Sequence, residues 1–504
     1  MKFLIYLSTH LKGHILLWVI LSLHYSEGVF AQVSFGVSFD ESDYKKVPLI
    51  EPAAGVKGFD FDTPEKLSLR PFCPVPGEQG ETGTCTAYAT GYSAMTLYTA
   101  LEQRVTDSAT LAQMTFSAAF IYNQIKKNKG DCSEGIAVEN ALRLLKSTGN
   151  CRFADFDTIE GCDHQPDSML LDSVGQHQIL DYAAILPFGA NSAQTISMLL
   201  QFLSDSIPPI IVFRAYENFV RPLAGEPVWS KLPEEQESGL HCMVVTGYDK
   251  VERSFEVMSS WGTDWADHGF YKVNWNDMGA ATLAAYIIVP NLYIANTLKE
   301  YKKTGASPAS PTLGTFALEG DVEFVRVEKD GSVQPSESFF LDENTGFYKP
   351  VSGVFPLNTL YQLYLSGTTK GKYVYVFSCD AQSETKMHFP KLNYSALSPG
   401  RYGRTAIPST QSALRLNLPG DDLVCILYSQ QEIPDIKLRI QSLKWATVAN
   451  FKEKFKDAFE DLQALPFGGN QIQYTPDQLS LRAKLVLDKG SLVPMVLWLQ
   501  AEEK

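Results

Sequence analysis

The stretch EQGETGTCTAYA, residues 78–89, decides how the rest of the chain is interpreted. Gln79 stands six positions before Cys85, with two glycines between them and a run of small and aromatic residues after. This layout predicts a helix that opens at Cys85 and continues through Glu102, which places the sulfur where backbone N–H groups and the helix dipole stabilise a thiolate. The Gln79 amide and the Cys85 N–H then converge on one carbonyl oxygen. The stretch predicts a nucleophilic thiol; a buried cysteine that only fills space is the alternative.

A thiolate nucleophile needs an imidazole partner, and an imidazole needs a group that orients it. Of the eight histidines, His241 and His268 remain when those in the N-terminal segment and in polar, unpatterned surroundings are set aside. His241 begins the apolar run HCMVVTGY, which predicts a buried strand. The later run SFEVMSSWGTDWADHGFYKVNW predicts two more strands joined by a turn with Gly and Trp.

Together these stretches resemble the papain-like cysteine peptidases. In that family a Gln, a Cys six residues later at a helix start, a distant His on a strand and an Asn before Ser-Trp-Gly form the active site. The resemblance implies that Gln79 is the oxyanion donor, Cys85 the nucleophile and His241 the general base and acid. It also implies that Trp261 shields the pair that orients the imidazole, a pair in which Ser259 replaces the family's Asn.

Two departures from the family pattern carry different weight. Thr86 follows the nucleophile where the family usually has Trp, and CTAYATGYSA is similar to a bacterial branch that lacks that Trp. Ser259 is the more serious departure, because a hydroxyl is shorter than an amide and holds the imidazole only at closer range or through a water. Two functions therefore stay open: a cysteine-type endopeptidase, or a catalytically weakened or inactive papain-like scaffold that binds.

A second turn of the first domain is expected to face substrate. The segment GDCSEG is similar to the family's Cys-x-Gly-Gly turn, which offers its backbone to the substrate, and Gly135 matches the last glycine. A solvated turn is the alternative. The family's disulfide from the loop before the nucleophile cannot form, because Thr82 stands at its first position; Cys132 is then free or paired elsewhere, with Cys151 or Cys162 as partner.

The expected fold class is α+β. Residues 72–292 are predicted to form a two-lobed papain-like domain, with a helical half that includes helical spacing at 116–128 and 136–147 and a barrel-like strand half after it. Residues 32–71 form a polar lead-in without helical periodicity. Residues 293–314 are rich in Lys, Ser, Ala and Pro and predict a linker.

Residues 315–504 are predicted to form a β-rich, sandwich-like accessory domain. Runs such as YQLYLSG, KYVYVFSCD and LVCILYSQQE alternate and are separated by turn residues. The run YVYVFSCD with LPGDDLVCILYS resembles a domain of unknown function attached to bacterial peptidases and kinases. This part contains no paired carboxylates, metal-ligand spacing or Cys–His set, so we expect it to bind or position rather than catalyse.

The N-terminal segment and the composition indicate where the protein is expected to act and what kind of partner it binds. Residues 1–31 combine lysines, a short apolar core and a Val-Phe-Ala step, which predicts a cleaved signal peptide and export to the periplasm, cell surface or exterior; an uncleaved anchor is the alternative. No later run predicts a membrane span in the mature chain. A net charge of −14 argues against nucleic acid, so a peptide or protein substrate is the expected partner. No cofactor or metal is implied, and the oligomeric state is not readable.

Overall fold

The computed structural model describes residues 34–50, 64–157, 162–223, 225–290, 315–366, 372–382, 384–398, 405–409, 411–462, 464, 472–475, 479–486 and 492–503. The predicted signal peptide at 1–31 and the predicted linker at 293–314 lie outside these ranges. Among the described residues, none of the helices has both the length and the apolar character to cross a bilayer.

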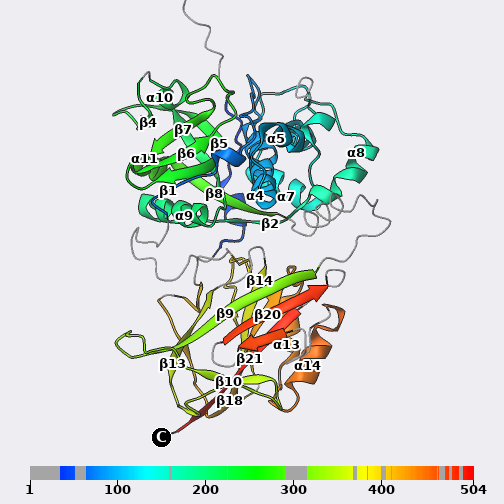
Figure 1. Cartoon of the computed structure of the whole chain (residues 1–504), viewed down its shortest axis with the longest axis vertical. Coiled ribbons are helices and arrows are strands. Elements are labelled where there is room, and N and C mark those ends of the chain that lie inside the picture. Colours follow the sequence, from blue (N-terminus) through cyan, green and yellow to red (C-terminus); the bar gives the residue numbers. More distant parts are fainter. Residues whose placement is uncertain are drawn as a thin grey trace, which may run out of the picture.

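The α+β fold class is confirmed. The first part of the chain combines helices with one eight-stranded sheet, and the last part is built from two further sheets (Figure 1). Helices of the first part are α2 (Glu41–Tyr44), α3 (Cys85–Ala87), the π-helix Tyr88–Ala94, α4 (Met95–Gln103), α5 (Ser108–Met114), α6 (Ala118–Ile125), α7 (Val138–Ser147), α8 (Ser168–Ser173), α9 (Ser192–Ser204), α10 (Glu217–Val220) and α11 (Trp275–Ala281), with single 3₁₀ turns at Arg70–Phe72, Phe153–Asp155 and Val174–His177.

The eight-stranded sheet has the order β2-β8-β3-β5-β6-β7-β4, with β1 paired to β5. Its strands are β1 (Lys66–Ser68), β2 (Ile179–Ala184), β3 (Ile210–Tyr216), β4 (Val228–Trp229), β5 (Glu237–Asp249), β6 (Ser254–Met258), β7 (Phe270–Asn274) and β8 (Thr282–Pro290). Strand β5 is central and almost fully buried from His241 onward, as the apolar run there predicted. The edge strand β2 lies on the side of the first domain that faces the second (Figure 1).

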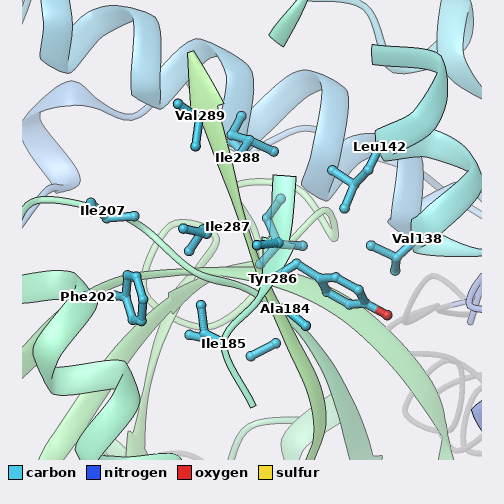
Figure 2. Close-up of a cluster of buried hydrophobic side chains, with 14 of the residues drawn as sticks. Val138, Leu142, Ala184, Ile185, Phe202, Ile207, Tyr286, Ile287, Ile288 and Val289 are labelled. Carbon is cyan, nitrogen blue, oxygen red and sulfur yellow. The ribbon is translucent and has the colours of Figure 1, made fainter. Parts of the chain in front are cut away.

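The core of the first domain joins the helical half to the sheet. Helix α7 buries one face, made by Val138, Ala141, Leu142 and Leu145, as helical periodicity requires. Figure 2 shows Val138 and Leu142 near Tyr286 of β8, with apolar side chains of β2, β8 and α9 in the same cluster. The hydroxyl of Tyr286 donates to the buried carboxylate of Glu139, the second residue of the helix.

A disulfide joins Cys132 to Cys162, with the two Cα atoms 5.8 Å apart. Of the two partners left open from the sequence, Cys162 is therefore the one used, and Cys151 is a buried free thiol. The bridge fixes the turn that carries Gly135 to the segment after the 3₁₀ turn Phe153–Asp155.

The accessory domain packs a seven-stranded and a six-stranded sheet against each other, which confirms the β-rich, sandwich-like arrangement. The seven-stranded sheet contains β10 (Phe339–Asp342), β11 (Phe347–Pro350), β12 (Phe355–Pro356), β14 (Tyr373–Cys379), β15 (Thr385–Phe389), β18 (Gly420–Ser429) and β21 (Leu492–Glu502). The six-stranded sheet contains β9 (Thr315–Val327), β13 (Leu360–Ser366), β16 (Thr405–Ile407), β17 (Leu414–Arg415), β19 (Ile472–Thr475) and β20 (Leu479–Val486).

Strand β18 shows why this domain has cores on both faces of one sheet. Val424, Ile426 and Tyr428 lie in the core between the sheets. The alternate residues, such as Cys425 and Leu427, point to the opposite face, because successive strand side chains alternate. That face is covered by α13 (Ile436–Ser442), α14 (Phe451–Ala458) and the 3₁₀ turn Glu460–Leu462, and its core is continuous with that of the first domain.

Candidate active site

Cys85 opens a helix, as its sequence position predicted. The helix runs through α3, the π-helix and α4 to Gln103. Two glycines shape the loop before it: Gly80 has a φ of +56°, and a Cβ on Gly83 would lie 2.4 Å from the Ser133 carbonyl oxygen. The Gly83 N–H donates to the Cys132 carbonyl over 2.8 Å, so the disulfide-bonded turn and the loop before Cys85 form one rigid unit.

Gln79 is held in place on both sides of its amide. Its backbone N–H donates to the Ser260 carbonyl (2.9 Å), and its side-chain Oε1 accepts from the Ser260 hydroxyl (2.6 Å). These bonds turn Nε2 toward the opposite side, where it donates to the carbonyls of Thr82 (2.8 Å) and Ser34 (3.0 Å). Both N–H groups of the amide predicted to stabilise an oxyanion are therefore bonded to backbone carbonyls in this structure. Ser260 was not singled out from the sequence, although it adjoins Ser259.

The imidazole of His241 lies on β5, within bonding distance of the residue predicted to orient it. His241 Nε2 is 3.0 Å from Ser259 Oγ, so the shorter serine side chain reaches the ring without a water. The Trp261 ring stacks on the imidazole with ring centroids 4.0 Å apart and an interplanar angle of 20°. If Nε2–H donates to Ser259, the lone pair is on Nδ1, the nitrogen that makes no hydrogen bond with the described residues. This tautomer can act as a base.

An N-terminal strap, which we define as residues 34–50, lies across the site. The backbone N–H of Gly36 donates to Cys85 Sγ over 3.1 Å. The Gly36 carbonyl accepts from the Ile136 N–H and from the Thr86 hydroxyl, both at 3.1 Å. The Ser38 N–H donates to the Ile136 carbonyl (3.1 Å), which completes a parallel bridge between residues 37 and 136. The predicted lead-in is thus a strand partner of the turn predicted to face substrate.

The strap fits because glycines meet at its narrowest point. A Cβ on Gly36 would lie 2.1 Å from the carbonyl oxygen of Gly83, and one on Gly135 would lie 2.8 Å from the carbonyl carbon of Gly36. Gly135 therefore does lie where an extended peptide passes, though its neighbour Ile136 makes the bonds. The Phe35 ring packs against Gly239. The centroids of the Phe35 and Trp261 rings are 6.2 Å apart.

Burial holds both reactive groups neutral while the strap is in place. It raises the pKa of the Cys85 thiol to about 11, against the smaller opposite effect of backbone N–H groups of Cys242 and Gly36. Burial also lowers the pKa of His241 to about 3. The expectation of a more acidic thiol is therefore wrong for this arrangement, because the side chains of both residues are fully excluded from solvent. Removal of the strap would return water to both groups.

The structure brings most of the predicted site residues together and adds several. The strap contacts Gln79, Cys85 and Gly135, and its Phe35 lies against Trp261. Trp261 stacks on His241, which is bonded to Ser259. Among the described residues no hydrogen bond joins Cys85 to His241, because His241 Nδ1 has no partner. The residues that the sequence did not indicate are Ser260 and strap residues Ser34 and Gly36. Among the described residues, no group of three or more His, Cys, Asp or Glu side chains is arranged to hold a metal ion.

Comparisons with known proteins give matches in structure only. No protein-family model matches the sequence, and no curated protein matches it. Among solved structures, the chain is similar to xylellain, a cysteine protease from Xylella fastidiosa, with 17% identity and a TM-score of 0.39 over 49% of this chain and 97% of that one.

Two further solved structures have similar values. A digestive procathepsin L of Tenebrio molitor larval midgut has 14% identity and a TM-score of 0.35 over 51% of this chain and 83% of that one. A cysteine protease from Carica candamarcensis has 14% identity and a TM-score of 0.33 over 45% of this chain and 99% of that one. Similarity at this level assigns no role to any residue here, so the roles below rest on the geometry of this chain.

Proposed function

We propose that this chain is an exported cysteine-type endopeptidase of the papain-like kind, described here in a latent form. The observation that carries the proposal is that strap residues Ser34 and Gly36 bond to Gln79 and Cys85. The sulfur also meets the N–H of Cys242, the residue next to His241, whose imidazole is bonded to Ser259. In the active form, His241 Nδ1 takes the thiol proton and the thiolate attacks a substrate carbonyl carbon. The Gln79 amide and the Cys85 N–H stabilise the oxyanion, and the imidazolium then protonates the leaving amine.

The backbone groups that the strap presents to the site explain why the strap is not itself a substrate. Gly36 presents an amide N–H to the sulfur, and an N–H is not an electrophile. The carbonyl bonded to Gln79 belongs to Ser34, two residues earlier, so the acceptor oxygen and the group at the sulfur belong to different peptide units. The strap occupies both the nucleophile and the oxyanion donor without offering a bond to cut.

The wider assignment follows the same proposal. Residues 72–292 form the peptidase domain, 293–314 a linker and 315–504 an accessory domain that binds or positions. The signal peptide at 1–31 directs export, to the periplasm, the cell surface or the exterior. Peptides or proteins are the substrates. The sequence similarity of CTAYATGYSA supports a bacterial secreted branch of the family.

The second candidate is an inactive papain-like scaffold that binds a partner. The observation that favours it is that Cys85 and His241 are both buried and neutral beneath the strap. Under this alternative the strap is a permanent part of the fold, and the thiol never meets a substrate.

Peptide hydrolysis by a strap-opened variant separates the two candidates. Gly36→Ala forces the strap from the site, because the added Cβ meets the backbone of Gly83. Gly36→Ala is expected to hydrolyse a fluorogenic peptide library, and Gly36→Ala/Cys85→Ala to be inactive with an unchanged fold. If Cys85 becomes accessible to iodoacetamide in Gly36→Ala and yet no peptide is cut, the scaffold candidate replaces the peptidase.

A further inference from the structure

The strap passes from the active site to the contact between the two domains. Beyond α2, its residues 48–50 lie between the edge strand β2 and the accessory domain. On the β2 side, the Ile50 N–H donates to the Ala184 carbonyl (2.9 Å), and the Ala184 N–H donates to the Pro48 carbonyl (3.0 Å). The strap therefore extends the eight-stranded sheet by one short parallel pairing.

The accessory domain pairs with the other edge of the same short strand. The Leu49 N–H donates to the Asn393 carbonyl (2.9 Å), and the Ser395 N–H donates to the Leu49 carbonyl (2.7 Å). Leu49 thus forms parallel bridges with Ala184 of the first domain and Tyr394 of the second. Both backbone groups of Leu49 are bonded to the accessory domain, while Pro48 and Ile50 are bonded to β2, so the strap is held on both sides.

Apolar burial and one buried polar contact reinforce this arrangement. Val47 and Ile50 are 6% and 2% exposed and belong to the core that spans both domains. Beside them, the Tyr373 hydroxyl of β14 donates to Asp181 Oδ2 of β2 over 2.7 Å. Lys146 Nζ lies 2.7 Å from the other oxygen of the same carboxylate. Tyr373 thus ties the accessory domain to the strand that receives the strap.

The first domain supplies the remaining hold on the strap. Tyr44 is buried, donates its hydroxyl to the Leu186 carbonyl (2.5 Å) and packs edge-on against Tyr286. This anchor lies between the Leu49 pairing and the segment across Cys85. The bonds at Leu49 and those at Gly36 therefore belong to one continuous element with fixed points at both ends.

We propose that the accessory domain acts as the anchor of the strap, so that separation of strap residue Leu49 from residues 393–395 exposes Cys85. Loss of the Leu49 pairing frees residues 47–50, and the strap then depends on Tyr44 and on the bonds of residues 34–38 near Cys85. The accessory domain then regulates the exposure of Cys85, in addition to the binding role proposed above. The proposal deepens the function proposed above and rests on it only for the statement that exposed Cys85 cuts peptides.

The test measures exposure of Cys85 in the full-length chain, so it needs no catalysis. Tyr373→Phe removes the hydroxyl bonded to Asp181 and keeps the ring, and Ser395→Pro removes the N–H that donates to Leu49. Tyr364→Phe is the matched control, because it deletes a hydroxyl bonded to Gln362 on β13, within the accessory domain. Carboxamidomethylation of Cys85 by iodoacetamide is followed by mass spectrometry, together with hydrogen exchange at residues 34–50.

Tyr373→Phe is expected to label Cys85 about ten-fold faster than the wild type, the change that corresponds to about 1.4 kcal/mol. Ser395→Pro should act in the same direction, and Tyr364→Phe should leave the rate unchanged.

Two results would overturn the proposal. One is faster hydrogen exchange at residues 47–50 in Tyr373→Phe or Ser395→Pro with no change in Cys85 labelling. The other is faster labelling of Cys85 by the same factor in the Tyr364→Phe control, which indicates general destabilisation. A different result would indicate that the proposed function is wrong while the anchor proposal holds. In that case Cys85 is labelled faster in Tyr373→Phe, as expected, but the variant cuts no peptide.

Discussion

The Gly36→Ala variant perturbs the contact between the strap and the loop before Cys85, because the added methyl group would overlap the backbone of Gly83. The new Cβ would lie 2.1 Å from the Gly83 carbonyl oxygen and 2.2 Å from its carbonyl carbon. Gly83 is held from the other side, because its N–H is bonded to the Cys132 carbonyl and the space beside its Cα is filled by the backbone of Ser133 and Glu134. The strap is therefore the part that must shift.

Displacement of the strap costs the bonds that hold it. These are the bonds from Gln79 to Ser34, from Gly36 to Cys85, from Ile136 and Thr86 to Gly36, and from Ser38 to Ile136. An extra methyl in a well-packed position typically costs about 1–3 kcal/mol. At about 1.4 kcal/mol per decade, the exposed form becomes roughly 5- to 150-fold more populated.

The assay is the rate at which iodoacetamide labels Cys85 in the full-length protein, read on the peptide that contains it. Gly175→Ala is the matched control, since a Cβ there has no heavy atom within 4 Å. Gly36→Ala should label one to two decades faster than both the wild type and the control. An unchanged rate in a variant whose circular dichroism and melting temperature match the wild type would refute the reasoning that the strap covers the thiol.

The remaining predictions concern the groups around the sulfur and use the Gly36→Ala background unless stated. Gln79→Ala should lower kcat roughly 10²-fold with little change in KM, measured on a fluorogenic peptide, and a change in KM alone would make Gln79 structural. Ser259→Ala should lower kcat roughly ten-fold or more, because it leaves a buried imidazole N–H without its acceptor; full activity would mean that another group orients His241. Burial lowers the pKa of His241 to about 3 while the strap is closed. In Cys85→Ala, where no thiolate pairs with the exposed imidazole, the strap-closed form is therefore favoured above about pH 6.5 and loses that advantage as the pH falls towards 3. Corrected hydrogen exchange at the Ser38 amide of that variant should be roughly 25-fold faster at pH 5 than at pH 7, and equal protection would contradict this.

The local parts of the site could be predicted from the sequence. The helix start at Cys85 follows from a glycine-containing loop before a helix-forming run, and the burial of β5 follows from the apolar run after His241. The direct bond between Ser259 and His241 is the closer-range option of the two that the sequence left open, and it forms because β6 ends close enough to β5 for a hydroxyl to reach. Side-chain reach depends on strand spacing, which the sequence does not state.

The strap could not be predicted in the same way, although it left a signal. The residues SFGVSF at 34–39 alternate between small or polar and apolar, which is the period of a strand. The lack of helical periodicity over residues 32–71 by itself predicts only a polar lead-in. Its partner, Ile136, is about a hundred residues away, and helix α7 begins at Val138 rather than at 136 because Ile136 pairs with the strap. The fit of Gly36 between Gly83 and Gly135 arises from three distant positions and is visible only in the folded chain.

The pH dependence of Cys85 alkylation in Gly36→Ala, with and without His241→Ala, tests the central claim most directly. A thiol paired with an imidazole remains reactive as a thiolate well below the ordinary cysteine pKa of about 8.5. Gly36→Ala should therefore react with iodoacetamide at pH 6, and its acid limb should move up towards pH 8.5 when His241 is removed. Identical pH profiles for the two proteins would contradict the account, because Cys85 would then be an ordinary thiol beneath a strap.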